Sequence, residues 1–495
     1  MKKEWLVKSF AFGVVVLFIG VSFQPTLAKD LPNKKSSMPV SNGNTFYVGG
    51  SGEGNYSQIQ DAIDNASDGD IVFVYDDSSP YYENVAINKA LFLCGENKQS
   101  TKIIGKVSLY SQNDVLITEF TINIITLERS SNITIINNDM TDENNGITIV
   151  DCSNFKIINN NITAQNDCGI EIITSHSKGT ITGNTIISKS WSSPSYACIS
   201  MRSVNDITIS NNTFISLRDG IYDGIRLEIG EDNTIRNNYF IDTGLELWSG
   251  TYKNNIYENM VNGKPLIFLN GATDQTVDDA GQVFLVHCRK VTVCNLSISK
   301  VPCGITLYDT TQSTIRNNNI SKCSKSIDCN YVNTNTFSQN MITGCYFYLS
   351  RSKRNIISEN TLQNSGSGFS LYLSSSNIFN NNIIKSCNGI DVSLSWNNRI
   401  IKNQIISCSL GIDFEGSFFN IIEQNNFINN SKNAFFVSSL RNRWIRNYWG
   451  ESTYLLYIIH GYLFSTFVFP DYFNYYFPLI NFDWHPAQEP YDIGQ

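Results

Sequence analysis

Residues 313–345 read STIRNNNISKCSKSIDCNYVNTNTFSQNMITGC. In this stretch an Asn, followed by any residue and then an apolar residue, occurs at Asn318 and again at Asn340, 22 residues later. Cys323 and Cys345 recur at the same interval. A fixed spacing of this length indicates a chain that is built from stacked structural repeats.

The Asn triplet recurs along most of the chain. The intervals between successive copies are 22, 24, 28, 26, 21, 59, 22, 20, 21, 22, 22 and 22 residues, and the interval of 59 contains a degenerate copy at Leu296-Ser297-Ile298. The triplets start at Asn138, Asn160, Asn184, Asn212, Asn238, Asn259, Asn318, Asn340, Asn360, Asn381, Asn403, Asn425 and Asn447. A second motif keeps step with them, at Gly146-Ile147, Gly169-Ile170, Gly224-Ile225, Gly244-Leu245, Gly304-Ile305, Gly368-Phe369, Gly389-Ile390 and Gly411-Ile412.

The residues between these motifs alternate in polarity. Ile and Val alternate with Thr, Ser and Asn, as in Asn132-Ile133-Thr134-Ile135, which is typical of strands with one buried face. Such short strands bury a core only if coiled rungs hydrogen-bond to one another. The sequence therefore predicts an all-β fold, a right-handed parallel β-helix of about 14 rungs. Helical repeats are disfavoured because no apolar pattern of period 3.6 recurs.

The triplet Asn residues are expected to stack as a ladder at the turns between strands. Asn tolerates the left-handed backbone conformation that turns require. Its amide can also bond to the residues above and below it in a stack.

The first residues have the features of a secretory signal. Lys2, Lys3 and Lys8 precede and flank an apolar stretch over residues 10–21, and a small-residue site ends at Ala28. Cleavage after Ala28 would export the protein to the periplasm, cell surface or medium. A membrane anchor is the competing interpretation, but about 12 apolar residues are fewer than the roughly 20 that span a bilayer.

The C-terminal region carries another apolar segment, Leu455 to Phe469. His460, Gly461 and Ser465 interrupt it, so we expect buried structure there and no transmembrane span in the mature chain. The rhythm of the repeat also breaks between Gly263 and Gly281. The predicted organisation is a signal peptide (1–28), a flexible linker (29–43), an N-terminal cap that contains a helix (44–70), a first β-helix subarray (71–262), a junction (263–284), a second subarray (285–449) and an aromatic C-terminal cap (450–495).

The charge of the chain argues against nucleic acid as a partner. Only 16% of residues are charged and the formal net charge is -8, and no run of Lys or Arg is long enough to follow a phosphate backbone. The twelve Cys could form disulfides in an oxidising compartment. We favour stacked interior thiols, because the pairs Cys323/Cys345 and Cys387/Cys408 are spaced by one rung.

Two sets of residues resemble the NosD-like right-handed β-helix family. One is the junction Asn262-Gly263-Lys264-Pro265-Leu266 with Ala280-Gly281-Gln282-Val283, and the other is the ending Phe482-Asp483-Trp484-His485-Pro486-Ala487 with Pro490-Tyr491-Asp492-Ile493. The likeness covers about residue 44 to the end. The resemblance implies the β-helix fold. It also implies one of two functions. The first is copper delivery, as in the periplasmic founding members that serve nitrous oxide reductase, and the second is the carbohydrate binding or sugar hydrolysis of the broader superfamily.

Copper handling would need imidazole, thiolate or thioether ligands that are gathered in one place. The candidate ligands are His287 and the adjacent Cys288, with Cys294 nearby. They lie in an apparently alternating strand, so a packed interior Cys288 is the favoured interpretation. We expect no cofactor.

Saccharide binding is suggested by projecting the rungs. Residues one and three places after the Ile of each Gly-Ile motif should point outward. The first row is Glu171, Arg226, Glu246, Thr306, Ser370, Asp391 and Asp413, and the second is Glu228, Trp248, Tyr308, Tyr372, Ser393 and Glu415. Together with Arg202 they would form an aromatic and polar strip, which suits an extended polysaccharide because sugar rings stack on aromatic faces. Alternatively, the aromatic residues only stiffen the sheet.

The primary hypothesis is therefore a secreted or surface-held β-helix that binds polysaccharide or serves as an envelope scaffold. The alternative is a hydrolase or lyase with Glu228 and Glu246 as its carboxylate pair on adjacent rungs. The motifs of related enzymes do not support it, because there is no paired basic motif of the pectate lyase type and His460-Gly461 lies outside the repeats. The third hypothesis is copper handling.

Overall fold

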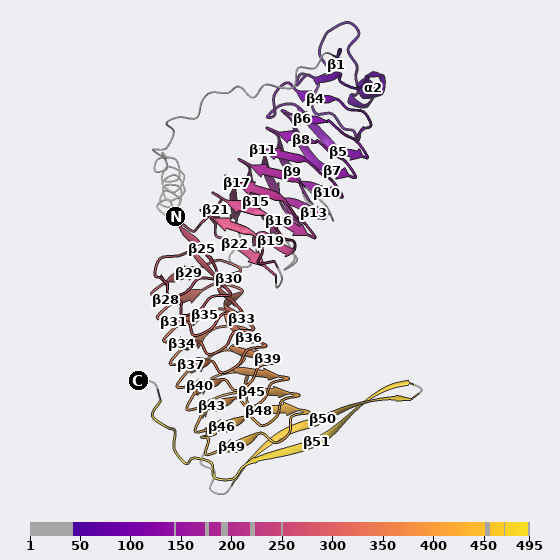
Figure 1. Cartoon of the computed structure of the whole chain (residues 1–495). Coiled ribbons are helices and arrows are strands. Elements are labelled where there is room, and N and C mark those ends of the chain that lie inside the picture. The colour runs from indigo at the N-terminus through magenta and orange to yellow at the C-terminus, as the bar shows by residue number, and fades with distance from the viewer. Residues whose placement is uncertain are drawn as a thin grey trace, which may run out of the picture. The chain divides into compact units, whose positions relative to one another are not determined.

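The computed structural model describes residues 43–142, 145–173, 178–189, 197–217, 223–248, 251–450, 456–469 and 471–493. The predicted signal peptide and the linker up to residue 42 lie outside this range. Residues 43–495 form one compact unit, a parallel β-solenoid of about 18 turns with 55% strand, so the predicted fold is confirmed (Figure 1). The number of turns is larger than expected because the expectation counted the Asn triplets that keep the spacing, and the first of these is at Asn138. The rungs built from residues 45–128 lie before it.

The first stack runs from the N-terminal end to the junction and has three columns of parallel strands. One column is β1 (Thr45–Val48), β2 (Ile71–Val74), β4 (Phe92–Gly95), β6 (Leu116–Thr118), β8 (Thr134–Ile136), β11 (Phe155–Ile158), β14 (Gly179–Thr182), β17 (Ile207–Ser210), β20 (Thr234–Arg236) and β23 (Asn255–Tyr257). The second, called here the lateral strands, is β3 (Val85–Ile87), β5 (Lys102–Tyr110), β7 (Thr121–Glu128), β10 (Ile147–Val150), β13 (Ile170–Ile173), β16 (Ala197–Arg202), β19 (Asp223–Ile229) and β22 (Gly244–Leu247). The third is β9 (Asp139–Asp142), β12 (Asn161–Ala164), β15 (Thr185–Ser188), β18 (Thr213–Ser216), β21 (Tyr239–Ile241) and β24 (Met260–Val261).

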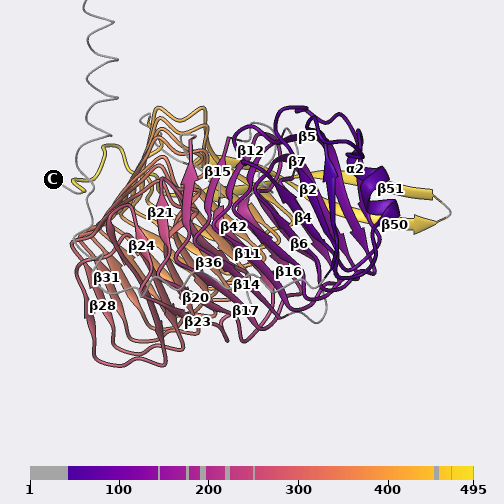
Figure 2. The same ribbon diagram turned by 90° about the horizontal axis from the view of Figure 1, so that it is seen from above.

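The second stack repeats this plan. Its lateral strands are β25 (Lys264–Asn270), β27 (Gln282–Val286), β30 (Cys303–Tyr308), β33 (Lys325–Asn330), β36 (Tyr346–Ser350), β39 (Phe369–Tyr372), β42 (Ile390–Ser393), β45 (Leu410–Glu415) and β48 (Lys432–Val437). Beside them run β26 (Thr276–Val277), β28 (Thr292–Cys294), β31 (Thr314–Arg316), β34 (Thr336–Ser338), β37 (Ile356–Ser358), β40 (Ile378–Asn380), β43 (Arg399–Ile401), β46 (Ile421–Glu423) and β49 (Arg443–Ile445). The third column is β29 (Ser297–Ser299), β32 (Asn319–Ser321), β35 (Met341–Thr343), β38 (Thr361–Gln363), β41 (Ile383–Lys385), β44 (Gln404–Ile406) and β47 (Asn426–Ile428). Figure 2 shows the strands of the first column, from β2 to β23, following one another in chain order.

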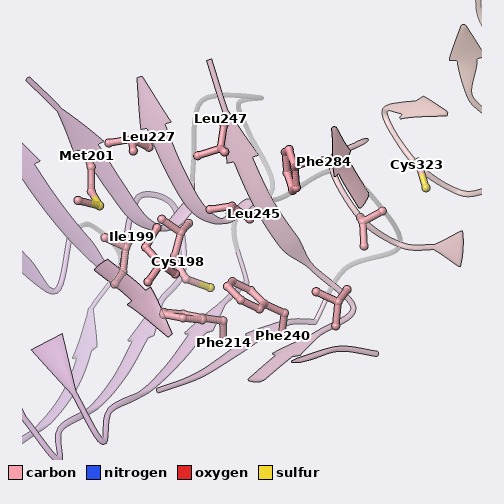
Figure 3. Packing of buried hydrophobic residues seen from close by; sticks show 14 of the residues in the cluster. Cys198, Ile199, Met201, Phe214, Leu227, Phe240, Leu245, Leu247, Phe284 and Cys323 are labelled. Carbon is pink, nitrogen blue, oxygen red and sulfur yellow. The ribbon is translucent and has the colours of Figure 1, made fainter. Parts of the chain in front are cut away.

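The interior is a continuous apolar column. Ile199 pairs in register with Ile225, which pairs with Leu245, so equivalent side chains stack on successive rungs. Phe214 and Phe240 stack beside them with ring centroids 5.0 Å apart, as Figure 3 shows. All twelve Cys are free thiols and all but Cys94 are buried, in agreement with the expected stacking of small interior side chains.

In the first stack an Asn ladder runs from Asn138 to Asn259, and in the second it runs from Asn318 to Asn447. Asn318 is representative: its Oδ1 accepts the backbone N–H of Leu296 at 3.0 Å, and its Nδ2 donates to Val293 O at 3.2 Å and to Asn340 Oδ1 at 2.9 Å. These side chains are buried, and they satisfy backbone groups that the corner of each rung leaves unpaired. The predicted ladder is therefore present.

Two details of the predicted ladder are wrong. Asn382, not Asn381, is the member on its rung, because Asn382 Oδ1 accepts the backbone N–H of Asn360. The left-handed conformation also belongs to the residue that precedes each ladder Asn, such as Asn317 (φ 57°) and Gln339 (φ 56°). Asn serves at the ladder position because its side-chain amide makes the hydrogen bonds. Several residue types occur at the left-handed position before it.

The two stacks meet at a reversal of the chain. The backbone turns at Asn262 and Gly263, where φ is 51° and 80°, and β24 pairs antiparallel with β25, which starts the second stack. Among the described strands β22 pairs only with β19. On its other side, Gln282 Oε1 accepts the N–H of Leu245 at 3.0 Å and Gln282 Nε2 donates to Leu245 O at 2.7 Å. A side chain thus replaces the backbone ladder at this rung.

The N-terminal end of the first stack carries the helix α2 (Ile59–Asn65), which packs against β1, β2 and β3. Ile59, Ala62 and Ile63 are fully buried. The carboxylate of Glu83 accepts the first backbone N–H groups of the helix, and Lys89 Nζ donates to the carbonyls at its end. These charges complement the helix dipole.

The C-terminal end is a long hairpin of β50 (Tyr457–Phe469) and β51 (Asp471–Asp483), which are paired antiparallel along their whole length (Figure 1). The expected burial of the segment from Leu455 to Phe469 is wrong for Ile458, Tyr462 and Phe464, which are 43%, 40% and 38% exposed. No helix among the described residues has the length and apolar character to cross a bilayer.

Asp483 closes the Asn ladder at this end. Its carboxylate accepts the backbone N–H groups of Arg446 and Asn447, the Asn447 side-chain amide and the indole N–H of Trp449. The carboxylate is fully buried and takes the place that the next ladder Asn would occupy.

Candidate functional site

The break between the stacks leaves a cavity of about 270 Å³ on the lateral side. It lies where β22 of the first stack faces β27, β30, β33 and β36 of the second. Its lining combines aromatic rings with charged groups: Leu245, Glu246, Leu247, Trp248, Tyr252, Phe284, Cys303, Thr306, Lys325, Asp328, Asn330 and Tyr348. We call it the junction cavity.

A buried charged cluster borders this cavity on β19 and β22. The register sets Arg226 opposite Glu246, and Arg226 Nε donates to Asp223 Oδ2 at 2.8 Å and to Glu246 Oε2 at 3.2 Å. Burial and the adjacent Glu246 raise the pKa of Asp223 well above its usual value. Burial alone would raise the pKa of Glu246, but the hydrogen bond from Asp223 and the charge of Arg226 lower it. Asp223 therefore holds a proton more tightly than an ordinary carboxyl group does, and Glu246 is the member of the pair that lines the cavity.

A second charged pair lies across the cavity on β33. Lys325 Nζ is 2.6 Å from Asp328 Oδ2. Burial opposes the charge of Lys325, but the carboxylate of Asp328 outweighs it and raises the pKa of Lys325. The ammonium group therefore stays charged, and its positive charge also helps to lower the pKa of Glu246.

Aromatic rings surround these charges. Trp248 is 47% exposed, and the guanidinium carbon of Arg226 lies 6.0 Å from the centroid of its ring. Tyr252 is buried and packs on Tyr308 with ring centroids 4.5 Å apart. Lys325 Nζ lies 6.0 Å from the ring centroid of Tyr348. The cavity thus offers one accessible indole face beside polar groups that are already paired.

The structure divides the predicted strip into two parts. Arg226, Glu246, Trp248 and Tyr308 meet at or beside the junction cavity, with Arg202 and Glu228 on the neighbouring strands as an ion pair of 2.8 Å. The expected exposure of Arg226 and Thr306 is wrong, since they are 8% and 4% exposed; the carboxyl groups of the cluster cover Arg226, and Thr306 lies in the wall of the cavity.

Of the remaining strip residues, Glu171 lies on β13, an earlier rung, and the others lie on later rungs. Tyr372 is half-buried on β39, three strands beyond Tyr308 in the lateral column. Asp391 and Asp413 face each other in register on β42 and β45 and line a second cavity of about 230 Å³, with Glu415 two residues further along β45. They belong to a separate acidic cluster.

Substitution of Asp413 by Asn should stabilise the fold at neutral pH. Burial, together with the charges of Asp391 and Glu415, raises the pKa of Asp413 to about 6 from 3.8. The folded state thus binds this proton more tightly than the unfolded state, so the stability falls as pH rises from about 4 to about 6. After allowance for solvent screening, Asp413→Asn is expected to gain about 1–2 kcal/mol at pH 8 and nothing at pH 4. Urea unfolding at both pH values measures the gain, and equal gains at both would contradict the assignment.

The predicted catalytic carboxylates have different partners. Glu228 pairs with Arg202, whereas Glu246 shares Arg226 with Asp223. Sequence projection did not identify Asp223, Tyr252, Lys325, Asp328 or Tyr348. Lys325 and Asp328 were missed because their rung has Ser326-Ile327 where the rungs that carry the second motif have Gly and an apolar residue. The repeat could have identified Asp328, because it lies one period of 22 residues after Thr306.

Comparison with known families identifies the chain's relatives. The family described as periplasmic copper-binding protein (NosD) matches residues 63–277 and 266–463. The chain belongs to the NosD family. No curated protein sequence matches this NosD-family chain.

Solved structures give only a distant likeness to this NosD-family protein. The Streptococcus pneumoniae surface protein and adhesin PfbA is 16% identical, with 76% of this chain and 94% of that chain covered and a TM-score of 0.29. The alginate lyase AlyF-OU02 is 12% identical, with 81% and 84% covered and a TM-score of 0.24. The PL6 family alginate lyase AlyGC is 10% identical, with 78% and 96% covered and a TM-score of 0.25.

His287 and Cys288, the predicted copper ligands of this NosD-family chain, do not come together as a copper site. His287 follows β27 in a left-handed corner (φ 51°), not in a strand as expected, and its Nδ1 lies 2.9 Å from Asp309 Oδ2. Cys288 is buried, and its thiol donates to Val286 O and Leu269 O. The exposed imidazole and the buried thiol are thus directed to different partners. In the described part of the chain, no three His, Cys, Asp or Glu residues are grouped so as to hold a metal ion.

Proposed function

We propose that this NosD-family protein is exported and binds an extended polysaccharide across its lateral strands, with the junction cavity as the central subsite. The observation that carries the proposal is the exposed indole of Trp248 at a cavity whose lining also includes two tyrosines and charged groups that are held by ion pairs. The family description as periplasmic and the signal-like residues 1–28 support export.

The chemistry of the cavity suits a sugar ring. An indole face packs against the C–H face of a pyranose ring, and fixed carboxylate and amide oxygens accept hydroxyl protons. Glu246 supplies such an oxygen from one side of the cavity, and Asp328 and Asn330 supply them from the other. Because the ion pairs hold these groups in place, little side-chain entropy is lost on binding. The parallel strands on either side continue the surface along the stack, as an extended chain requires.

The first test is the loss of binding in Trp248→Ala. The substitution should raise the Kd for a bound polysaccharide at least tenfold, about 1.4 kcal/mol, because it removes the stacking face without leaving a buried polar group unpaired. Trp396→Ala is the matched control, since Trp396 is 44% exposed and lies outside the junction cavity. Affinity electrophoresis of residues 29–495 measures both. Equal retention of the two variants would refute the assignment of the site.

Cleavage of the bound polysaccharide is the second candidate function. The two carboxyl groups that line the junction cavity, Glu246 and Asp328, favour it, because glycoside hydrolysis uses two carboxyl groups that flank the bond. Release of reducing ends or unsaturated sugars that disappears in Glu246→Gln, and not in Glu228→Gln, would establish it. Turnover that is unchanged in Glu246→Gln would exclude this carboxylate.

A further inference from the structure

The charge of the lateral strands bears on which polysaccharide could bind. From β13 to β22 and from β27 to β48, these strands carry four cationic side chains: Arg202, Arg226, Lys325 and Lys432. The same strands carry eight carboxyl groups: Glu171, Asp223, Glu228, Glu246, Asp328, Asp391, Asp413 and Glu415. In these strands carboxyl groups outnumber cationic groups by eight to four, and six of the eight carboxyl groups are at least partly exposed.

The cations at the junction cavity are already engaged. Arg226 Nε binds Asp223 and Glu246, and Lys325 Nζ lies 2.6 Å from Asp328 Oδ2. A carboxylate on a ligand is recognised best by a guanidinium that presents two donors to it. A sugar carboxylate would have to compete with these existing ion pairs in a largely buried setting, and that is costly.

The acidic cluster on the later rungs adds repulsion. Among the described residues no ion pair includes Asp391, Asp413 or Glu415. Lys432 lies nearby, but its Nζ sits 3.4 Å from the ring centroid of Phe435. The mutual effect of these carboxylates is visible in the raised pKa of Asp413, to which Asp391 and Glu415 contribute. A polyanion along this surface would meet the same negative charges on successive rungs.

We infer, on the basis of the proposed polysaccharide-binding function, that the ligand is an uncharged, hydroxyl-rich polysaccharide and that the lateral surface rejects polyuronates. Neutral sugars need a stacking face and fixed hydrogen-bond acceptors, which the junction cavity provides. Polyuronates carry a negative charge on every residue, and a surface carboxylate repels each such charge that comes close to it. The repulsion weakens as salt is added.

The test is affinity electrophoresis of residues 29–495 in gels that contain galactomannan, mixed-linkage β-glucan, alginate or polygalacturonate. EDTA is included so that no divalent cation bridges carboxylates. We expect at least one neutral polysaccharide to bind with a Kd at least tenfold below that of either polyuronate at low salt. We also expect retention on the neutral polymer to be weakened in Trp248→Ala.

The outcomes separate this inference from the proposed function. If a polyuronate is retained more strongly and Trp248→Ala still weakens retention, the inference about charge is overturned and the binding site stands. If no polysaccharide of either class is retained, the proposed function fails and the inference fails with it.

The double variant Asp391→Asn/Asp413→Lys should increase polyuronate retention at low salt but not at 0.5 M salt. Unchanged retention would overturn the electrostatic explanation.

Discussion

Asn318→Ala is expected to lower the free energy of unfolding by about 4 kcal/mol. The variant leaves the backbone N–H of Leu296 and the carbonyl of Val293 without their partners in the interior, and it removes a bond to the Asn340 side chain. Each buried polar group left unsatisfied costs about 1–3 kcal/mol. The shift in the urea midpoint at constant slope measures the loss.

The adjacent residue offers a matched control. Asn319 has the same side chain on the same rung, but it is exposed. Asn319→Ala should change the stability by less than about 0.5 kcal/mol. If the two variants lose similar amounts of unfolding free energy, the ladder amides contribute no more to stability than surface amides do. That result would contradict the conclusion that the ladder amides satisfy buried backbone groups at the corners of the rungs.

Arg226→Met is expected to destabilise the protein by about 3–5 kcal/mol at pH 8, because it leaves the buried Asp223 and the partly buried Glu246 facing each other without a cation. Arg226 contacts Asp223 and Glu246 at 2.8 and 3.2 Å. The pKa of Asp223 is already raised in the folded protein, and loss of the guanidinium raises it further. Stability that depends on a raised carboxyl pKa falls as pH rises, so the variant should recover most of its loss at pH 4. Thermal or urea unfolding at the two pH values measures this.

Two further variants isolate the charge effect. Arg202→Met removes a guanidinium whose side chain is 55% exposed and which pairs with Glu228, so we expect a loss of no more than about 1 kcal/mol. Adding Asp223→Asn to Arg226→Met should restore much of the lost stability at pH 8, since one of the unpaired carboxyl groups is then neutral. A loss that is independent of pH and not rescued would indicate a packing defect instead.

The repeat was predictable because it depends on local rules. An interval of 22 residues between Asn318 and Asn340 fixes which residues stack, and alternation fixes which of them face the interior. The ladder rung at residues 380–382 could not be assigned from the motif, because three consecutive Asn residues allow either Asn381 or Asn382 to start a triplet. Only the hydrogen bond to the preceding rung distinguishes them.

The junction cavity could not be predicted in the same way. It arises where the periodic pairing stops and the side chain of Gln282 takes over from backbone groups on β22. Periodicity places Glu246 and Trp248 on the lateral surface. It does not predict that Lys325, about 80 residues later in the sequence, lines the same cavity. Tyr252 lies in the break itself, where no period applies.

The terminal hairpin shows another limit of pattern reading. An apolar strand in a core and an exposed apolar strand have the same composition, so the segment from Leu455 to Phe469 gave no sign that Tyr462 and Phe464 would face solvent. Burial depends on what the rest of the chain packs against the strand, which is a property of the assembled structure.

Oxidative footprinting of the chain with and without a bound neutral oligosaccharide tests the location of the proposed site most directly. Trp248 and Trp396 are exposed to similar extents, 47% and 44%, so both should be oxidised in the free protein. The account predicts that the ligand lowers the oxidation of Trp248 several-fold and leaves that of Trp396 unchanged. Protection of Trp396 alone, or equal oxidation of Trp248 with and without ligand, would contradict the placement of the glycan at the junction cavity.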